Sequence, residues 1–472
     1  MSCNDASRMF LKANLSVDKW EIIRESMKSM QVNLPCYKTI SRNRDKVIPP
    51  VNQTGCEVKV NLSDMICNTT QRTLEFLNEE NPNLLKSLKS NQLIIEAKCG
   101  ADGCGNFNEL QNKQTMDENV DSSSLYSCGF VLLSIKTNEN EIIWQNQVPN
   151  SCDYVRNLSL SYKSETKKTI VDTYSDLVEE TMNFYSLPIT VGDMFFEILG
   201  SDSSTIHFTM YDVKSINAIT SYMTASPNLS TQSCWVCSKS KSSFFDEDIA
   251  STNENIGRDK LKFGISPLHC QLRVMEWLFN IAIKAQFKQN VSLNSEEFKS
   301  KKAAAQAKFA EKLKLKMFVV RNGYGTTNTG RTARIFFANP CITAEILRVP
   351  QHLIADFSSL LNILNKTETT DALRHEFEQK ANKVFDFLKN SKKFQRFGLS
   401  PTVHRVLTHG KAFLDFFDTT PIGATSEAAI ESKHKVIKHI KANNAYQGDL
   451  QRNILDIMKR SLFKTDPFFV LK

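Results

Sequence analysis

The sequence predicts an α/β protein with a strand-containing core that is interrupted by a large, mainly helical insertion. Two changes in the hydrophobic pattern predict this fold class. From residue 92 onward, short apolar runs typical of strands begin, whereas residues 267–316 and 342–390 repeat their apolar residues at helical spacing without a strand pattern. The chain has 472 residues, 41% of them hydrophobic, which is enough for two to four structural units with substantial cores.

A helical region, which we assign to residues 1–50, comes first. Residues 17–35 have apolar residues at helical spacing, and a basic stretch follows until the linker-like pair Pro49–Pro50. A short helical module with a basic end suits a DNA-binding or dimerisation region, and it equally suits a solvated surface helix. The candidate DNA contacts in this region are Lys38, Arg42 and Arg44.

The core is expected to begin after a helical segment at residues 51–91, and its first part spans residues 92–222. The apolar pattern predicts a meander of three strands, then a helix, then a further strand. These segments are residues 92–102, 129–135, 141–144, 170–186 and 205–212. Three strands, a helix and a strand is the order of elements in an RNase H-like core.

The helical insertion is assigned to residues 223–420, and residues 421–472 are assigned to a final core helix with a C-terminal tail. The insertion starts with a polar, serine-rich part around one close cysteine pair, and the helical pattern follows. The core is therefore expected to be discontinuous in sequence.

Charge and targeting signals restrict the class of protein. Lysine and arginine number 59 against 51 acidic residues, and this net charge of +8 is compatible with a polyanionic partner but is shared by many other enzymes. The N-terminus has no secretory signal pattern, and no run of about 18 apolar residues occurs. We therefore expect an intracellular protein without membrane association, whose 12 cysteines are mostly reduced.

Three separated carboxylates are candidates for catalysis. Asp102 and Asp212 each end an apolar strand-like run, and Glu431 lies in a helix-forming segment that Ser426 could cap. Each has an ordinary alternative, because aspartates are common in turns and Glu431 can pair with Lys435 on a helix surface. If the three converge, they repel one another unless cations neutralise them. Two Mg²⁺ or Mn²⁺ ions would do so and could act on either side of a phosphodiester.

A second candidate site combines Cys234 and Cys237 with the distant His404 and His409. Two cysteines and two histidines suit tetrahedral zinc, which would be structural and would join distant segments. The histidine spacing of five is unusual, since residues i and i+5 do not share a face of an α-helix, so the helix geometry must break between them. A redox role for the cysteine pair is less favoured, because no thioredoxin-like βαβ pattern surrounds it.

A glycine-rich segment at residues 321–332 comes close to a nucleotide-binding P-loop. Arg331 stands where that motif requires lysine, so we reject a nucleotide cofactor. The segment can still offer backbone N–H groups and guanidinium groups to DNA phosphates, or it can be a plain connector. The candidate DNA contacts here are Arg321, Asn328, Arg331 and Arg334. The pair His269–Cys270 is a weaker ligand candidate, for which a structural role is favoured.

Taken in order, these motifs resemble Transib transposases and, more distantly, the catalytic core of the RAG recombinase of antigen-receptor rearrangement. The resemblance covers residues from about 17 to 468. The matching stretches are LPCYKTI at 34–40, GADGCG at 100–105, TMYDVKSINAIT at 209–220, SCWVC at 233–237, SPLHC at 266–270, GYGTTNTGRTARIFF at 323–337, TVHRVLTHG at 402–410 and SEAAIESKHK at 426–435. RING-type and nonamer-binding additions of the recombinase are not apparent, so Transib is the closer relative.

The resemblance implies a DDE-type, cut-and-paste transposase that binds double-stranded DNA at terminal inverted repeats as a nuclear homodimer. The catalytic carboxylates would be Asp102, Asp212 and Glu431, and the family has a helical zinc-bearing insertion between the last two. The zinc ligands would be Cys234, Cys237, His404 and His409, with the histidine spacing that the family shows.

Two alternatives stay open within this resemblance. Glu427, one helical turn before Glu431, is a competing third carboxylate. The chain could also be a domesticated DNA-binding protein that has kept the fold and lost transposition. The third alternative, which needs no relationship to transposases, is a zinc protein with no nuclease site.

Overall fold

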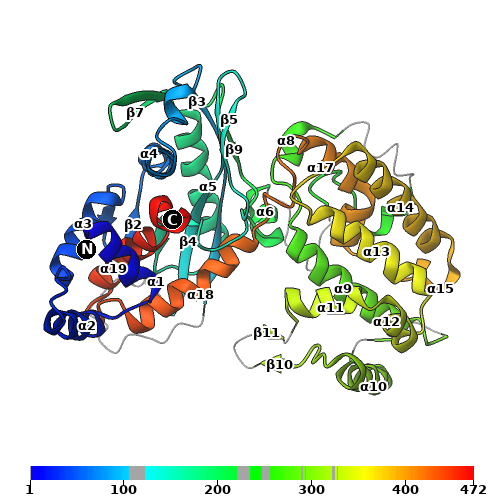
Figure 1. Ribbon diagram of the computed structural model, residues 1–472. Helices are drawn as coiled ribbons and strands as arrows, with labels where there is room; N and C mark the ends of the chain where they lie inside the picture. The colour runs from blue at the N-terminus through cyan, green and yellow to red at the C-terminus, as the bar shows by residue number, and fades with distance from the viewer. Residues whose placement is uncertain are drawn as a thin grey trace. The chain divides into compact units, whose positions relative to one another are not determined.

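The protein has a mixed α/β fold that divides into two compact units. The computed structural model describes residues 2–105, 123–220, 234–246, 256–288, 291–292, 294–321, 325–326 and 328–472. Unit 1 comprises Met1–Met210 and Ala428–Lys472, and unit 2 comprises Tyr211–Glu427 (Figure 1). Unit 1 is therefore discontinuous in sequence. Unit 2 includes the whole of residues 223–420, the range assigned above to the insertion.

Three helices begin unit 1: α1 (Cys3–Lys12), α2 (Val17–Ser29) and α3 (Tyr37–Val47). The side chains of Ser2 and Ser16 cap the first two by accepting hydrogen bonds from main-chain N–H groups. Trp20 is fully buried, and its indole N–H donates to the carbonyl of Pro35 at 3.0 Å. The pattern at residues 17–35 therefore predicted a helix correctly, although α2 ends at Ser29.

A nine-stranded mixed sheet forms the centre of unit 1, in the order β1-β2-β6-β4-β3-β8-β7, with β5 pairing with β4 and β9 with β3. Strand β3 pairs antiparallel with β4 but parallel with β8 and β9, which makes the sheet mixed. The strands are β1 (Asn52–Thr54), β2 (Glu57–Lys59), β3 (Gln92–Cys104), β4 (Leu125–Thr137), β5 (Ile142–Gln145), β6 (Arg156–Ser161), β7 (Leu187–Val191), β8 (Met194–Ile198) and β9 (Thr205–His207).

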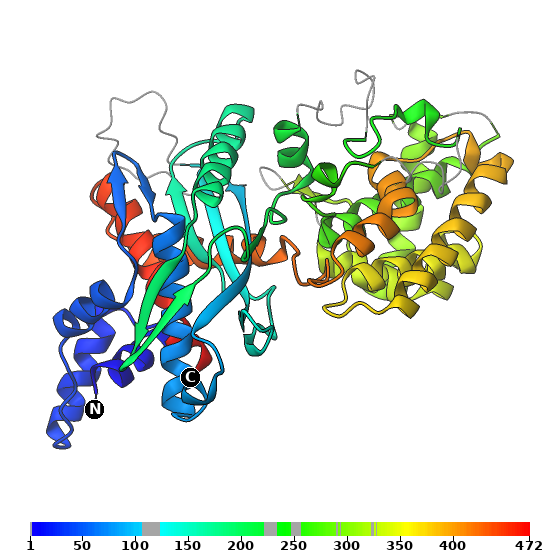
Figure 2. The ribbon, with the colours of Figure 1, turned by 90° about the horizontal axis from the view of Figure 1, so that it is seen from above.

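The sheet carries helices on both faces. Neighbouring residues of β6 show this, because successive strand residues point to opposite faces. Arg156 donates to Asn68 at 2.8 Å on one face, and Asn157 accepts from Ser461 at 2.7 Å on the other. The first face is covered by α4 (Leu62–Glu80) and α5 (Lys167–Met182), and the second by α18 (Ala428–Asn443) and α19 (Leu450–Lys464) (Figure 2). The short elements of unit 1 are η1 (Leu85–Ser87) and α20 (Pro467–Leu471).

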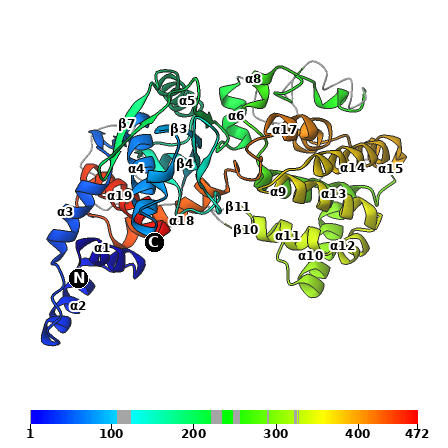
Figure 3. The same cartoon turned by 45° about the horizontal axis from the view of Figure 1, so that its top comes forward.

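Unit 2 is mainly helical in its described part. Helix α9 (Pro267–Lys284) is central, and it contacts α10, α11, α12, α13 and α16 (Figure 3). The other elements are α6 (Val213–Ile219), η2 (Lys241–Ser243), α8 (Arg258–Leu261), α10 (Glu296–Leu313), β10 (Val320–Arg321), β11 (Gly325–Thr326), α11 (Gly330–Ala338), α12 (Pro340–Leu347), α13 (Gln351–Leu364), α14 (Asp371–Asn390), α15 (Lys392–Gln395), α16 (Pro401–His404), the π-helical turn η3 (Arg405–His409) and α17 (Gly410–Phe416). No helix within the described ranges combines the length and the apolar character that crossing a bilayer requires.

Candidate functional site

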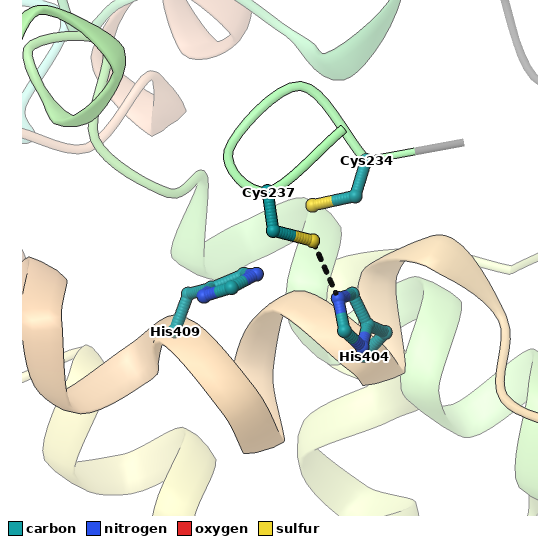
Figure 4. Close-up of side chains that lie close together, drawn as sticks. All are labelled: Cys234, Cys237, His404 and His409. Atoms are coloured by element: carbon teal, nitrogen blue, oxygen red, sulfur yellow. Dashed lines mark hydrogen bonds between the residues drawn. The ribbon is translucent and has the colours of Figure 1, made fainter. Parts of the chain in front are cut away.

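Two cysteines and two histidines lie together in unit 2. The potential ligand atoms of Cys234, Cys237, His404 and His409 all lie within 4.8 Å of one another (Figure 4). The Sγ atom of Cys237 is 3.3 Å from Nε2 of His404. Three of the four residues are buried, and Cys237 is half-buried. The sequence-predicted cluster is therefore present as a compact group of two sulfur and two nitrogen donors.

A π-helical turn explains how two histidines five positions apart reach one point. Helix α16 ends at His404, and the turn η3 continues from Arg405 to His409. A π-helix has about five residues between bonded positions, whereas an α-helix has four, so it brings positions i and i+5 to one side. The expected break in α-helical geometry is found at this place.

Neighbouring side chains fix the orientation of the His404 ring. The Thr408 hydroxyl lies 3.2 Å from Nδ1 of His404, and the Phe244 ring stacks on the imidazole at 3.8 Å with an interplanar angle of 3°. Because Nδ1 faces the hydroxyl, Nε2 is directed toward Cys237. Hydrogen bonding of one ring nitrogen is the usual way in which proteins prepare the other for a metal.

The cysteine pair is prepared for a positive ion. Burial opposes ionisation of Cys234, but hydrogen bonds from Cys237, His404 and His409 hold its pKa well below the ordinary value. The pKa of Cys237 is raised, first by its hydrogen bond to Cys234 and then by burial. The pair therefore favours a single thiolate that the other thiol stabilises. The four donors fit zinc, which prefers tetrahedral sulfur and nitrogen ligands, so the cluster can bind a metal such as zinc.

In unit 1, Asp102 lies near the end of β3, opposite Ser127 of β4. One carboxylate oxygen, Oδ1, accepts a hydrogen bond from the N–H of Gly103 at 2.8 Å. The other, Oδ2, is 3.7 Å from Nδ1 of His434 on α18. Burial, and to a smaller extent the charge of Lys438, lowers the pKa of His434 to about 4, so its ring is neutral near pH 7 and the contact is not an ion pair.

Glu431 lies on the same helix as His434, three positions earlier, and is half-buried. Residues three apart on a helix are neighbours on its surface. The start of α18 packs into the apolar core of unit 1, where Ile430 joins Val131 and Met210. The fold of unit 1 thus brings Asp102 close to the helical turn that follows Glu431, although Asp102 and Glu431 are 329 positions apart in the sequence.

Two glycines of the sheet, one in β3 and one in β4, allow neighbouring segments to pack closely against these strands. A Cβ atom on Gly100 would overlap the main-chain carbonyl of Met210, and one on Gly129 would lie 3.0 Å from the side chain of Val155 and 3.4 Å from that of Ile430. The N–H of Met210 donates to the carbonyl of Cys99 at 3.1 Å. The close packing of the segment before Asp212 and of the start of α18 therefore requires residues without a side chain at these positions of β3 and β4.

Asp212 caps helix α6 at the beginning of unit 2, where its side chain accepts a hydrogen bond from the N–H of Ser215 at 2.7 Å. It follows Met210, the last residue of the first segment of unit 1, by two positions. In the described part of the chain, the cysteine–histidine cluster is the one group of three or more potential metal ligands within that mutual distance. Convergence of Asp102, Asp212 and Glu431 stays a prediction.

Glu427 has a different environment from Glu431. It is 1% exposed, and its carboxylate accepts hydrogen bonds from Ser266 and Ser426 and lies 3.0 Å from Nδ1 of His269. Burial alone would raise the pKa of Glu427, but the contacts with His269 and Ser266 lower it below the ordinary value. Both carboxylate oxygens are thus engaged within unit 2.

The candidate DNA-binding residues differ in their accessibility. Lys38 and Arg42 on α3 are exposed, as are Arg331 and Arg334 on α11. Arg44 is largely buried and pairs with Asp45 at 3.1 Å and Asp456 at 3.6 Å. The amide of Asn328 donates to Glu276 at 2.8 Å and accepts from the N–H of Phe318 at 2.9 Å, so it ties unit 2 together. The side chain of Arg321 lies outside the described residues.

Sequence analysis did not single out several residues that the structure places at these sites. His434 and Ser127 contact Asp102, and a signal for His434 was present in its helical spacing from Glu431. The fully buried Arg405 stacks over the ring of Trp235 at 3.9 Å, next to the cysteine pair, and no local pattern marks it. A comparison with protein-family models and one with curated proteins each found no match.

Proposed function

We propose that this protein is a metal-dependent DNA endonuclease and strand transferase of the cut-and-paste type. It would recognise terminal inverted repeats as a nuclear homodimer, nick one strand, and use the new 3′-hydroxyl to attack the opposite strand. The flanking DNA would be left with hairpin ends, and the excised ends would be joined to target DNA. The sequence resemblance motivates these steps, and what unit 1 adds is the proximity of Asp102 to the helix that carries Glu431.

The proposal includes an RNase H-like core in unit 1. Its support is the order and direction of the strands: β3, β4 and β6 are antiparallel neighbours, α5 follows, and β9 then pairs parallel with β3 on the opposite side from β4. With β5 and the β7–β8 hairpin treated as additions, this is the three-strand, one-helix, one-strand order expected for such a core.

The observation that carries the proposal is the proximity of α18 to the end of β3. Asp102 Oδ2 is 3.7 Å from His434, and Glu431 lies one helical turn before that histidine. Asp102 and Glu431 would thus serve one reaction centre, and Asp212 would join them from the segment that follows Met210. Two divalent cations, when bound, would activate the attacking oxygen and stabilise the leaving one.

The environment of Glu427 favours Glu431 as the third carboxylate. A metal-binding carboxylate must offer its oxygen lone pairs, and Glu427 uses both oxygens in contacts with Ser266, Ser426 and His269. Glu427 would instead anchor the chain just before α18 begins at Ala428.

Two basic surfaces support a DNA partner. Lys38 and Arg42 are exposed one helical turn apart on α3. Helix α11 begins at Gly330 with a capping box formed by Thr329 and Thr332, and Arg331 and Arg334 are exposed on its first turns. A helix N-terminus next to cationic side chains suits a phosphate group. The zinc ion would be structural, joining the cysteine turn to α16 and η3.

Duplex DNA taken from the two flanks of the gene, incubated with the protein and Mg²⁺ or Mn²⁺, tests the proposal on denaturing gels. We expect nicks and hairpins, and a loss of about a hundredfold or more in cleavage rate for Asp102→Ala and Glu431→Ala. Glu139→Ala is the matched control, since Glu139 is an exposed acid in unit 1. DNA binding without any cleavage would favour a domesticated DNA-binding protein, and cleavage that survives Glu431→Ala would overturn that assignment.

A further inference from the structure

The distance between the Asp102 carboxylate and the His434 ring is too long for a hydrogen bond. Oδ2 and Nδ1 are 3.7 Å apart, whereas a hydrogen bond from an imidazole N–H to an oxygen is about 2.7–3.2 Å long. The two side chains are only 19% and 12% exposed, respectively. Two polar atoms thus lie in a largely enclosed place, too far apart for a direct hydrogen bond and close enough for one ion to contact both.

Ser127 offers a partner for the other ring nitrogen of His434, Nε2. Its hydroxyl donates to the main-chain carbonyl of Asp102 at 3.5 Å, and its Oγ lies 3.3 Å from Nε2 of His434. A hydroxyl has one proton and two lone pairs, so a Ser127 hydroxyl that donates to Asp102 accepts from an Nε2–H group. In that tautomer the Nδ1 atom, 3.7 Å from Oδ2, presents a lone pair to the carboxylate of Asp102.

We propose that Nδ1 of His434 is a ligand, together with Asp102, of a divalent cation in the reaction centre; this inference rests on the proposed function. Two ligand atoms that bind one ion at about 2.1–2.2 Å and at right angles lie about 3 Å apart, so a small side-chain movement from 3.7 Å suffices. A hydrogen bond from Nε2–H to Ser127, whose Oγ is 3.3 Å away, would be the arrangement by which metal-binding histidines are oriented.

An imidazole ligand changes the preferred metal. Oxygen-only sites suit Mg²⁺, whereas imidazole nitrogen favours transition metals. Among these, affinity rises from Mn²⁺ to Co²⁺. The site is therefore expected to bind Mn²⁺ more tightly, relative to Mg²⁺, than a site made of carboxylates alone. His434 would in this way select the cation that serves Asp102.

Electron paramagnetic resonance of Mn²⁺ tests the proposal on the full-length, zinc-loaded protein labelled with ¹⁵N-histidine. We expect a ¹⁵N coupling to bound Mn²⁺ that disappears in His434→Ala, with Mn²⁺ affinity reduced at least about tenfold and Mg²⁺ affinity, measured by competition, reduced less. His439→Asn is the matched control, because His439 is an exposed histidine of the same helix. Zinc content and circular dichroism verify that each variant is folded.

The outcomes separate this inference from the proposed function. If Asp102→Ala abolishes Mn²⁺ binding while His434→Ala leaves both the affinity and the spectrum unchanged, His434 is not a ligand and the carboxylate site stands. If Mn²⁺ binds equally well to native protein and Asp102→Ala, or does not bind, the cation at Asp102 and this inference both fail. A His434→Asn variant that restores the Mn²⁺ affinity without the ¹⁵N coupling supports ligation, since an amide oxygen can replace the imidazole at a metal but has no ¹⁵N-histidine signal.

Discussion

Glu427 illustrates how a single buried charge is made tolerable. A carboxylate removed from water is costly unless hydrogen bonds replace its solvation. Ser266 and His269, at the beginning of α9, supply these bonds together with Ser426. The cluster thereby fixes the last residue of unit 2 before the chain enters α18 of unit 1.

We expect Glu427→Ala to reduce the free energy of unfolding by about 1–3 kcal/mol, because it removes the acceptor of these buried hydrogen bonds. A carboxyl group whose pKa is lowered by folding stabilises the protein above its unfolded pKa, near 4.5, and this contribution is lost as the pH falls through the folded pKa. The native protein should therefore lose stability below about pH 4.5 more steeply than Glu427→Gln.

Urea unfolding between pH 3 and 7, followed by tryptophan fluorescence, provides the measurement. Glu311→Ala is the control, because Glu311 is an exposed acid of unit 2. Equal stability of the Glu427 and Glu311 variants at pH 7 would show that the buried cluster contributes nothing.

At the scale of elements, the cysteine turn and the π-helical turn depend on each other. Cys234 and Cys237 lie in a short turn closed by a hydrogen bond from the N–H of Ser238 to the carbonyl of Cys234 at 2.8 Å. The histidines belong to α16 and η3, about 170 positions later in the sequence. A metal ion bound by all four would join the turn to α16 and η3, in addition to the burial of Trp235 and Val236 within the turn.

We expect removal of zinc with a chelator to lower the unfolding temperature of unit 2, because the ion joins segments that are distant in sequence. Cys234→Ser should reduce the zinc content from one ion per chain to a small fraction, as measured by mass spectrometry of the metal. Cys341→Ser, at an exposed cysteine of α12, should leave the content unchanged. Full zinc content in Cys234→Ser would contradict the four-ligand site.

The sequence predicted those elements whose own residues carry a regular apolar pattern. These include α2, α4, α5 and the long strands β3 and β4. It did not predict β6, because Arg156 and Asn157 are buried polar residues whose partners, Asn68 and Ser461, lie 88 and 304 positions away. The same limit applies to His434, whose importance appears only when β3 and α18 are adjacent.

For the candidate sites, residue type and spacing were informative to different degrees. The cysteine–histidine cluster is present as predicted; residue type made it a candidate, and the family resemblance accounted for the histidine spacing of five. Asp102, Asp212 and Glu431 are ordinary residue types, so their selection depended on the family resemblance. Asn328 was selected as a candidate DNA contact in the glycine-rich segment. Its side-chain amide instead makes hydrogen bonds within unit 2 through both its nitrogen and its oxygen.

At the scale of the whole molecule, the excess of positive charge has a measurable consequence if DNA is the partner. Each protein–phosphate contact releases counterions. The logarithm of the affinity therefore falls by about 0.9 per contact for each tenfold increase in salt concentration. We expect the double variant Lys38→Gln, Arg42→Gln to reduce the slope of log affinity against log salt by about 2, with similar effects on different DNA sequences.

Fluorescence anisotropy of labelled duplex DNA at several salt concentrations gives this slope. The double variant Lys86→Gln, Lys89→Gln removes the same charge from another part of unit 1 and serves as the control. An identical reduction in both variants would mean that net charge alone, and not the α3 surface, determines binding.

The π-helical turn at Arg405–His409 also has a genetic consequence. Such a turn corresponds to an α-helix with one additional residue. Deleting one residue between His404 and His409 would restore ordinary helical winding and leave the two histidines four positions apart, which is again one face of an α-helix. An in-frame loss of three nucleotides should therefore keep both imidazoles on one side of the helix, whereas an in-frame gain of three would turn one of them by about 100° away from the other while leaving every cysteine and histidine codon intact.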